Sequence, residues 1–310
     1  MTQEAPTTET QPPEDVAIRA TALTKHYGHT HALESLDLAV RHGEVYGYLG
    51  PNGAGKTTTI RLALGLHRPT SGTVAVFGID AWADPVAAHR HLAYVSGEPA
   101  LWPSLTVAET LEFLGRLRQG KNRDRSYEKV LLERFQLETD RKVRSLSKGN
   151  RQKVQLVSAL SAQAELLLLD EPTAGLDPLM EVAFRETIGE AKERGATVFL
   201  SSHILSEVES LCDRVGILRD GRLVDEGTLA ELRHLAFQTV EATFSGTPPD
   251  VNGVPGVQHA SVDGATLRVE VSGDLAHLLQ AISAHDIVTL RTREPSLEEI
   301  FLHHYAREPA

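Results

Sequence analysis

The feature that most constrains this chain is a glycine-rich segment that directly follows a short apolar run. Residues 50–57 read Gly-Pro-Asn-Gly-Ala-Gly-Lys-Thr and fit the pattern G-x-x-x-x-G-K-[ST]. The apolar run Val45–Leu49 precedes them, and a helix-like segment over residues 56–66 starts at their end. A strand, a loop and a helix in this order are the setting of a phosphate-binding loop. The sequence therefore predicts an α/β fold with a nucleotide site at this loop.

The loop holds the residue types that phosphate binding requires. Glycines let backbone N–H groups turn toward an anion, and the helix N-terminus adds partial positive charge. We expect Lys56 to reach the β- and γ-phosphates and the Thr57 hydroxyl to bind Mg²⁺. The predicted nucleotide-binding residues are Gly50, Pro51, Asn52, Gly53, Ala54, Gly55, Lys56, Thr57 and Thr58.

Two carboxylates follow a second apolar run further along the chain. Residues 166–169 are four leucines, and Asp170 and Glu171 come directly after them. A buried strand would deliver both acids at its carboxyl end, where ligands gather in open α/β sheets. We expect Asp170 to hold Mg²⁺ and Glu171 to polarise the attacking water as general base. Two surface acids at a strand end are the other interpretation, which the glycine-rich loop disfavours.

From Val16 onward, short apolar runs alternate with helix-like segments, as is typical of an α/β sheet. Residues 106–160 depart from this alternation, because Thr106 and Glu109 form a capping-box pattern and two or three helices follow. We therefore expect a helical subdomain over about 98–162 inserted into the α/β core. Strands are predicted at residues 17–22, 35–40, 45–49, 73–77, 93–96, 166–169, 197–201 and 215–219.

The two ends of the chain differ from this core. Residues 1–15 are rich in Pro, Thr and Glu and are predicted to be a disordered tail. The core would run over residues 16–235 and close with a capped helix at Thr228. Residues 238–310 are predicted to form a small α+β domain, with strands at 239–244, 267–271 and 287–291, a helix at 274–284 and a last helix capped by Ser296.

Composition excludes several classes of protein. The chain has 31 Lys and Arg against 42 Asp and Glu, a net charge of -11, which disfavours non-specific nucleic-acid binding. A single cysteine, Cys212, excludes an internal disulfide framework. No stretch approaches the 18 apolar residues of a membrane span, and the first residues lack the features of a signal peptide. We therefore expect a cytoplasmic protein without a nucleic-acid partner.

Three further segments stand in a fixed order around the paired carboxylates. Residues 146–152 read Leu-Ser-Lys-Gly-Asn-Arg-Gln, residues 172–177 read Pro-Thr-Ala-Gly-Leu-Asp, and residues 201–203 read Ser-Ser-His. With the glycine-rich loop and the Asp-Glu pair, they resemble the ATP-binding subunits of ABC transporters over residues 16–235. Residues 238–310, with the ending Glu-Pro-Ser-Leu-Glu-Glu-Ile-Phe at 294–301, resemble the C-terminal extension of the ABC-2 export branch, and are most similar to that of drug and antibiotic exporters.

The resemblance implies a P-loop NTPase core, with a RecA-like sheet and an antiparallel edge, that binds ATP with Mg²⁺. It implies that Tyr27 stacks on adenine and that His203 contacts the γ-phosphate. It also implies that Asp177 lies at a dimer seam and that the signature residues complete the site of an opposite subunit. Those signature residues are Ser147, Lys148, Gly149 and Asn150.

The resemblance further implies partners and a location. Two copies, or one copy and a similar subunit, would enclose two ATP molecules head to tail. The pair would drive a separate transmembrane permease from the cytoplasmic face of the membrane. An exposed Trp102 could anchor that contact, and a core tryptophan is the equally open alternative.

The sequence departs from the family pattern at two places. Lys148 and Asn150 stand where the usual signature has Gly and Gln, and Lys148 points either toward the partner's nucleotide or into solvent. No Gln occurs in residues 94–98, so Gly97 occupies the expected position of a glutamine that binds Mg²⁺. Glu98 or water would replace it, or Thr57 and Asp170 alone would hold the metal. The other thirteen of the fourteen histidines are interpreted as solvated or packed side chains.

Alternative functions remain open at this point. The chain could drive an importer, or an exporter of lipid or polysaccharide. It could also be an ABC ATPase that acts outside transport, or a nucleotide-binding regulator without turnover. Intact Lys56, Asp170, Glu171 and His203 weigh against the regulator.

Overall fold

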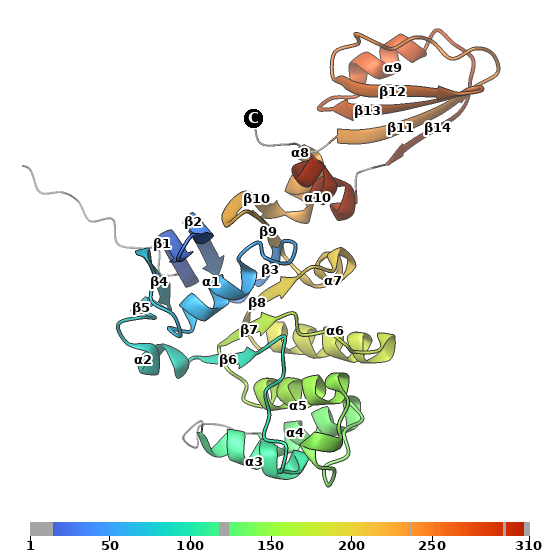
Figure 1. Ribbon diagram of the computed structural model, residues 1–310. Coiled ribbons are helices and arrows are strands. Elements are labelled where there is room, and N and C mark those ends of the chain that lie inside the picture. The colour runs from blue at the N-terminus through green and yellow to red at the C-terminus, as the bar shows by residue number, and fades with distance from the viewer. Residues whose placement is uncertain (1–14, 118–123, 236, 294–295, 307–310) are drawn as a thin grey trace, which may run out of the picture.

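The computed structural model describes residues 15–117, 124–235, 237–293 and 296–306. A sheet of six strands, ordered β10-β9-β3-β8-β7-β6, carries the glycine-rich loop (Figure 1). Five of them run parallel, and β10 pairs antiparallel at the edge. The strands are β3 (Val45–Leu49), β6 (Leu92–Val95), β7 (Leu166–Asp170), β8 (Thr197–Ser202), β9 (Arg214–Arg219) and β10 (Arg222–Thr228).

The centre of this sheet is buried on both faces. Every residue of β3, β7 and β8 is buried, which explains their nearly continuous apolar sequences. One large core lies on the side of Phe184 and Leu131, and a second lies around Tyr48 and Phe199 on the other side. Because β3, β8 and β7 are direct neighbours, the loops that leave their carboxyl ends lie next to each other.

A second sheet, ordered β2-β1-β4-β5, is antiparallel. Its main feature is a long hairpin that turns at Gly28, whose φ of 59° is in the left-handed region. Both strands of the hairpin are longer than predicted. Polar residues near the turn, such as Thr24 and His31, interrupt the apolar pattern from which strands were predicted. The strands are β1 (Val16–Tyr27), β2 (Thr30–Arg41), β4 (Ser71–Val76) and β5 (Ile79–Asp80).

The predicted helical insertion is present between β6 and β7 (Figure 1). Thr106 and Glu109 form the predicted capping box, with the Thr106 N–H donating to Glu109 Oε2 at 2.7 Å and the Glu109 N–H to Thr106 Oγ1 at 3.1 Å. The helices up to the C-terminal sheet are α1 (Lys56–Ala63), α2 (Pro85–His89), α3 (Val107–Leu117), α4 (Arg125–Arg134), α5 (Lys148–Leu160), α6 (Pro178–Glu193), α7 (Leu205–Leu211) and α8 (Leu229–Leu235), with a 3-10 turn at Val143–Ser145.

A third sheet, ordered β12-β13-β11-β14, follows with its own small core around Val240, Phe244 and Leu278. Its elements are β11 (Phe237–Phe244), β12 (Val257–Asp263), β13 (Thr266–Ser272), α9 (Ala276–Ile282) and β14 (Ile287–Arg293). The last helix, α10 (Leu297–Ala306), leaves this sheet and lies beside α8 (Figure 1). Leu297 and Ile300 join the large core, and the Leu297 N–H donates to Glu209 at 2.9 Å.

The α/β fold class is confirmed. The domain boundaries remain a prediction, and residues 1–14 of the predicted tail lie outside the described residues. The described part of the chain contains no helix that combines the length and apolar character of a membrane span.

Candidate nucleotide-binding site

The glycine-rich loop joins β3 to α1 in a conformation that depends on glycine. Gly53 and Gly55 have φ of 86° and 116°. A Cβ on Gly55 would lie 2.5 Å from the Ala32 carbonyl oxygen, so only glycine fits there. Gly55 is also the N-cap of α1 and has no side chain to occupy the first-turn N–H groups. These N–H groups are therefore available to an anion.

Lys56 lies inside the loop with 5% of its side chain exposed. Its Nζ donates to the carbonyl oxygens of Gly50 at 2.6 Å and Pro51 at 3.2 Å, and lies 3.6 Å from Glu171 Oε1. Burial lowers the pKa of Lys56, while Glu171 and Asp170 favour its charged form. A phosphate that enters the loop would therefore meet the Lys56 ammonium group, which is held in place and whose positive charge is only partly balanced by the neighbouring carboxylates.

Asp170 ends β7 and is almost fully buried. Its Oδ2 accepts from Thr57 Oγ1 at 2.9 Å, and its Oδ1 accepts from Ser201 Oγ at 2.6 Å. Ser201 belongs to β8, which is the neighbour of both β7 and β3. The adjacent strands thus bring Thr57 and Asp170 together from positions 113 residues apart in the sequence.

The oxygen atoms of Thr57 and Asp170 fit a magnesium site. Mg²⁺ takes hard oxygen ligands at about 2.0–2.1 Å in an octahedron, so adjacent ligands stand about 2.9 Å apart. The two oxygens already have this spacing, and Ser201 holds the second Asp170 oxygen in place.

Glu171 adopts a backbone conformation that is uncommon for its type, with φ of 46°. Its N–H lies 3.1 Å from the Ser201 carbonyl oxygen and 3.2 Å from Ser201 Oγ. This turn directs the side chain to Lys56, and Glu171 Oε1 also lies 3.2 Å from His203 Nδ1. Left-handed backbone at a non-glycine residue is strained and is concentrated at functional sites.

His203 follows β8 and is half exposed, at 49% of its side chain. The turn that carries it is fixed by Ser202, whose Oγ accepts from the Ile204 N–H at 2.9 Å and donates to Glu207 at 2.6 Å. The structure therefore brings together the predicted residues Lys56, Glu171 and His203. We call these three residues with Thr57 and Asp170 the phosphate site.

Tyr27 is exposed at the end of β1, as a base-stacking residue would be, with 40% of its surface accessible. Its hydroxyl contacts His67 Nδ1 at 2.5 Å, and the Lys25 ammonium lies 4.8 Å from its ring centroid. One face of the ring is thus already beside a cation. Stacking of Tyr27 on adenine remains a prediction.

Residues 146–152, the signature segment, begin α5 away from the phosphate site. Ser147 caps the helix, and its Oγ accepts from the Asn150 N–H at 3.2 Å. Ser147 and Lys148 are exposed. Figure 1 shows α1 and α5 apart, with β6 and β7 between them. The structure does not bring the signature segment to the glycine-rich loop of its own chain.

Gly149 instead lies against the segment that follows Glu171. A Cβ on Gly149 would stand 2.2 Å from the Gly175 carbonyl oxygen, so the two backbones touch. Two residues later, Asp177 caps α6 by accepting from the Met180 N–H at 3.1 Å. The predicted seam residue Asp177 and the signature segment are therefore joined within one chain through Gly149 and Gly175.

Comparison with known proteins decides the family. Residues 33–174 match the family model described as ABC transporter, and residues 227–305 match that of the DrrA1-3-like ATP-binding protein, C-terminal domain. The daunorubicin resistance ATP-binding protein DrrA3 of Streptomyces coeruleorubidus is 36% identical over 93% of this chain and 96% of its own. The chain belongs to the ABC transporter ATP-binding proteins. The expected ATP-hydrolysing ABC subunit is thereby confirmed.

Two other matches support this membership in the ABC family. The bacitracin transport ATP-binding protein BcrA of Bacillus licheniformis is 41% identical over 67% of this chain and 69% of its own. A solved structure of a dimeric ATP-binding cassette, bound to ADP and Pi after hydrolysis, is 26% identical. It covers 68% of this chain and 98% of its own, with a TM-score of 0.61.

Gly97, which the resemblance placed at the position of a glutamine, follows β6. A Cβ on Gly97 would lie 3.1 Å from the Asp170 carbonyl oxygen, so the segment passes close to the end of β7. Glu98 is exposed, and its backbone bonds to Ser96. Gln152 of α5 donates to the Ser96 carbonyl oxygen at 3.2 Å, which ties this segment to the signature helix.

Two residues of this ABC subunit have contacts at the site that the sequence did not predict. Ser201 hydrogen-bonds to the Asp170 carboxylate and to the Glu171 N–H. Its position at the end of a strand was the only feature of the sequence that could have suggested this role. Gly175 gave no signal, because its contact with Gly149 exists only in the folded chain.

Proposed function

We propose that this protein is the motor of a drug or antibiotic exporter and works as a head-to-tail dimer on a separate transmembrane permease. The proposed roles in ATP hydrolysis rest on one observation. Glu171 lies between Lys56 and His203, within reach of both side chains. The names of the relatives above, which concern daunorubicin and bacitracin, support the class of transported compound. The location would then be peripheral, on the cytoplasmic face of the membrane.

Within one chain, the proposed roles follow from the geometry. The glycine-rich loop and Lys56 bind the phosphates, and Lys56 exchanges part of its contact with Glu171 for phosphate oxygen. Glu171 then accepts a proton from the attacking water, and His203 holds the same carboxylate on its solvent side. Thr57 and Asp170 would hold Mg²⁺, which neutralises phosphate charge when bound.

The dimer is proposed because the signature segment lies apart from its own phosphate site. Ser147 and Lys148 are exposed at the start of a 13-residue helix, whose N-terminal N–H groups suit an anion. A second copy, placed head to tail, would present these groups to the γ-phosphate of the first. The solved ATP-binding cassette described above is dimeric, which supports the formation of a dimer.

Glu171→Gln tests the catalytic assignment. We expect it to reduce ATP hydrolysis by at least about a hundredfold, because the amide cannot accept the proton of water. ATP would then accumulate in a stable dimer, which size-exclusion chromatography with light scattering detects. Glu165→Gln is the matched control, since Glu165 precedes the same strand with 66% of its side chain exposed. Normal turnover, or a variant that stays monomeric in ATP, would contradict the proposal.

Trp102 offers a surface for the proposed permease. Its ring lies 4.6 Å from that of Phe113, edge to face, and both side chains are exposed, at 43% and 39%. Exposed neighbouring aromatics are typical centres of protein interfaces. Gln152 of the helical insertion bonds to Ser96, and the adjacent Gly97 lies close to the Asp170 backbone, which gives a path for motion between the insertion and the phosphate site.

Trp102→Ala tests this surface. We expect co-purification with the membrane subunit to fall about tenfold or more, while ATP hydrolysis by the isolated protein is unchanged. Trp82→Ala is the control, because Trp82 is equally exposed, at 45%, and lies outside the helical insertion. Equal loss of the partner in both variants would overturn Trp102 as the docking residue.

A further inference from the structure

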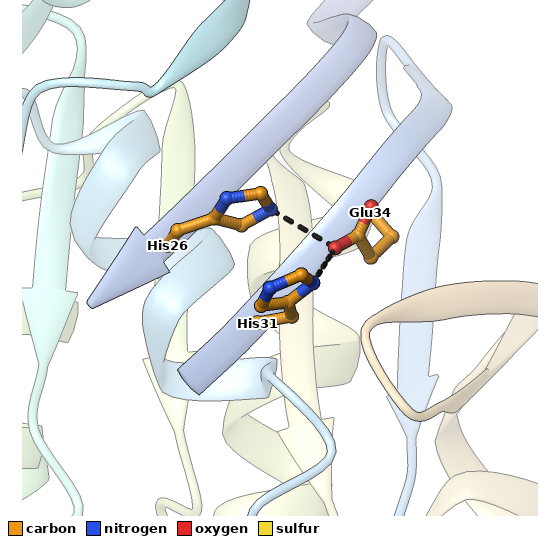
Figure 2. A group of neighbouring side chains, drawn as sticks. All are labelled: His26, His31 and Glu34. Carbon is orange, nitrogen blue, oxygen red and sulfur yellow. Dashed lines mark hydrogen bonds and ion pairs between the residues drawn. The ribbon is translucent and has the colours of Figure 1, made fainter. Parts of the chain in front are cut away.

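Two histidines and one glutamate converge near the turn of the β1–β2 hairpin (Figure 2). His26 lies on β1, and His31 and Glu34 lie on β2. His26 Nε2 is 2.9 Å from Glu34 Oε1, and His31 Nδ1 contacts the same oxygen. The two imidazole rings stack with centroids 4.0 Å apart. One potential metal-binding atom from each residue lies within 4.8 Å of the others.

A bulge in β2 creates this convergence. His26 pairs with His31, whereas Lys25 pairs with Leu33, so Ala32 is an extra residue in β2. In a regular strand, residues three apart point to opposite faces. The bulge restores a common face for His31 and Glu34, and bulges are known to redirect side chains in this way. Ala32 itself is held firmly, because its carbonyl oxygen lies against Gly55 and Gly221.

The donor set has the chemistry of a transition-metal site. Two imidazoles and one carboxylate are ligands that Zn²⁺ takes at about 2.0–2.2 Å, often with water as a fourth ligand. A tetrahedral ion would separate its ligand atoms by about 3.3 Å. The observed spacing requires only a small opening of the cluster, in which the metal replaces the shared hydrogen-bond protons. His31 is 59% exposed, so an ion can reach the cluster from solvent.

We propose that His26, His31 and Glu34 form a binding site for Zn²⁺ or a similar divalent transition metal. The site is separate from Thr57 and Asp170, whose all-oxygen ligands suit Mg²⁺. It lies directly beside Tyr27 and, through Ala32, against the glycine-rich loop. A bound ion would cross-link the two arms of the hairpin and stabilise the conformation that presents Tyr27. Metal binding needs no nucleotide and does not depend on the function proposed above.

The test measures Zn²⁺ binding to the full chain without an affinity tag and without nucleotide, in competition with a chromophoric chelator. We expect one tightly bound Zn²⁺ per chain, and a melting temperature that rises on its addition. His31→Gln and Glu34→Gln should each weaken binding at least about tenfold and abolish the rise in melting temperature. A large excess of Mg²⁺ should leave the bound Zn²⁺ in place.

His91→Gln is the matched control, because His91 Nδ1 contacts Glu165 at 3.0 Å in another exposed histidine–glutamate pair. It should bind Zn²⁺ as the unmodified protein does. The melting temperature without metal shows whether each variant is folded, and Glu34→Gln keeps the size of the side chain it replaces. Zn²⁺ binding that is equally strong in His31→Gln, Glu34→Gln and the unmodified chain would overturn the site. Loss of Zn²⁺ with Mg²⁺ addition would also overturn it.

Discussion

The phosphate site and the signature segment belong to the same ABC subunit but are built in opposite ways. In the phosphate site, buried Asp170 and Lys56 are satisfied by neighbours from three adjacent strands and loops. In the signature segment, Ser147 and Lys148 are exposed, while the Gly149 backbone and the buried Gln152 contact the rest of the chain. This difference is what the proposed dimer requires, because the phosphate site is assembled within one chain and the exposed start of the signature helix is not part of it.

Gly149→Ala is the strongest test of this contrast. The added Cβ would meet the Gly175 carbonyl oxygen at 2.2 Å, and because this is a backbone atom the helix start must move. We expect steady-state ATP hydrolysis to fall about a hundredfold, as a misplacement of about 1 Å can do. Binding of a fluorescent nucleotide to the single chain should be unchanged, because the phosphate site is untouched.

Gly189→Ala on α6 provides the control for the added methyl group. No heavy atom lies within 4 Å of a Cβ there, so ATP hydrolysis should be normal. The helix should also gain about 0.5–1 kcal/mol of stability. If Gly149→Ala hydrolyses ATP as Gly189→Ala does, the tight contact between the signature segment and Gly175 has no role in hydrolysis.

Ser201→Ala tests the phosphate site, the other of the two regions compared. It removes the 2.6 Å hydrogen bond to Asp170 Oδ1 and the side-chain contact to the Glu171 N–H. Partners of metal ligands typically contribute tenfold to a hundredfold to affinity. We expect the Mg²⁺ concentration for half-maximal phosphate release to rise about tenfold. Ser283→Ala, at the C-terminal cap of α9, is the control. An unchanged Mg²⁺ requirement in Ser201→Ala would exclude Ser201 as a positioning residue.

The contrast between the two regions also explains what the sequence could predict. Strands β3 and β7 were predictable because both faces are buried and their sequences are nearly continuous apolar runs. Strand β10 was missed because its residues alternate between exposed and half-buried and include Asp225 and Glu226. Strand β12 is mostly exposed and was missed for the same reason. Burial explains these strands but not β14, which was predicted at 287–291 although all of its residues are exposed.

For the site, the sequence predicted the motifs and the proximity of Thr57 to Asp170, but it did not predict the following two contacts. The glycine-rich loop and the Asp-Glu pair were visible because each function is carried by consecutive residues. The contact of Gly149 with Gly175 depends on how two distant backbones pack. The grouping of His31 with Glu34 depends on the bulge at Ala32, and a regular strand would have placed them on opposite faces.

The smallest expected effect concerns the joint between the helical insertion and α6. Glu190 accepts from Arg134 at 2.6 Å and from the Tyr127 hydroxyl at 2.8 Å, so it links α4 to α6. The hydrogen bond from Arg134 is the main cause that lowers the pKa of Glu190, although partial burial opposes it. We expect Glu190→Gln to reduce the free energy of unfolding by about 1 kcal/mol, a value limited by solvent exposure of the pair.

The pH dependence of this loss follows from the direction of the shift. A carboxylate with a lowered pKa in the folded state stabilises the fold above its unfolded value of 4.5, and this stabilisation disappears as the pH falls through the folded value. Urea unfolding should therefore separate Glu190→Gln from the unmodified protein at neutral pH and show a shrinking difference below about pH 4.5. The exposed Glu193 on the same helix, changed to Gln, is the control. A difference that stays constant with pH would mean that packing, rather than charge, joins the helical insertion to α6.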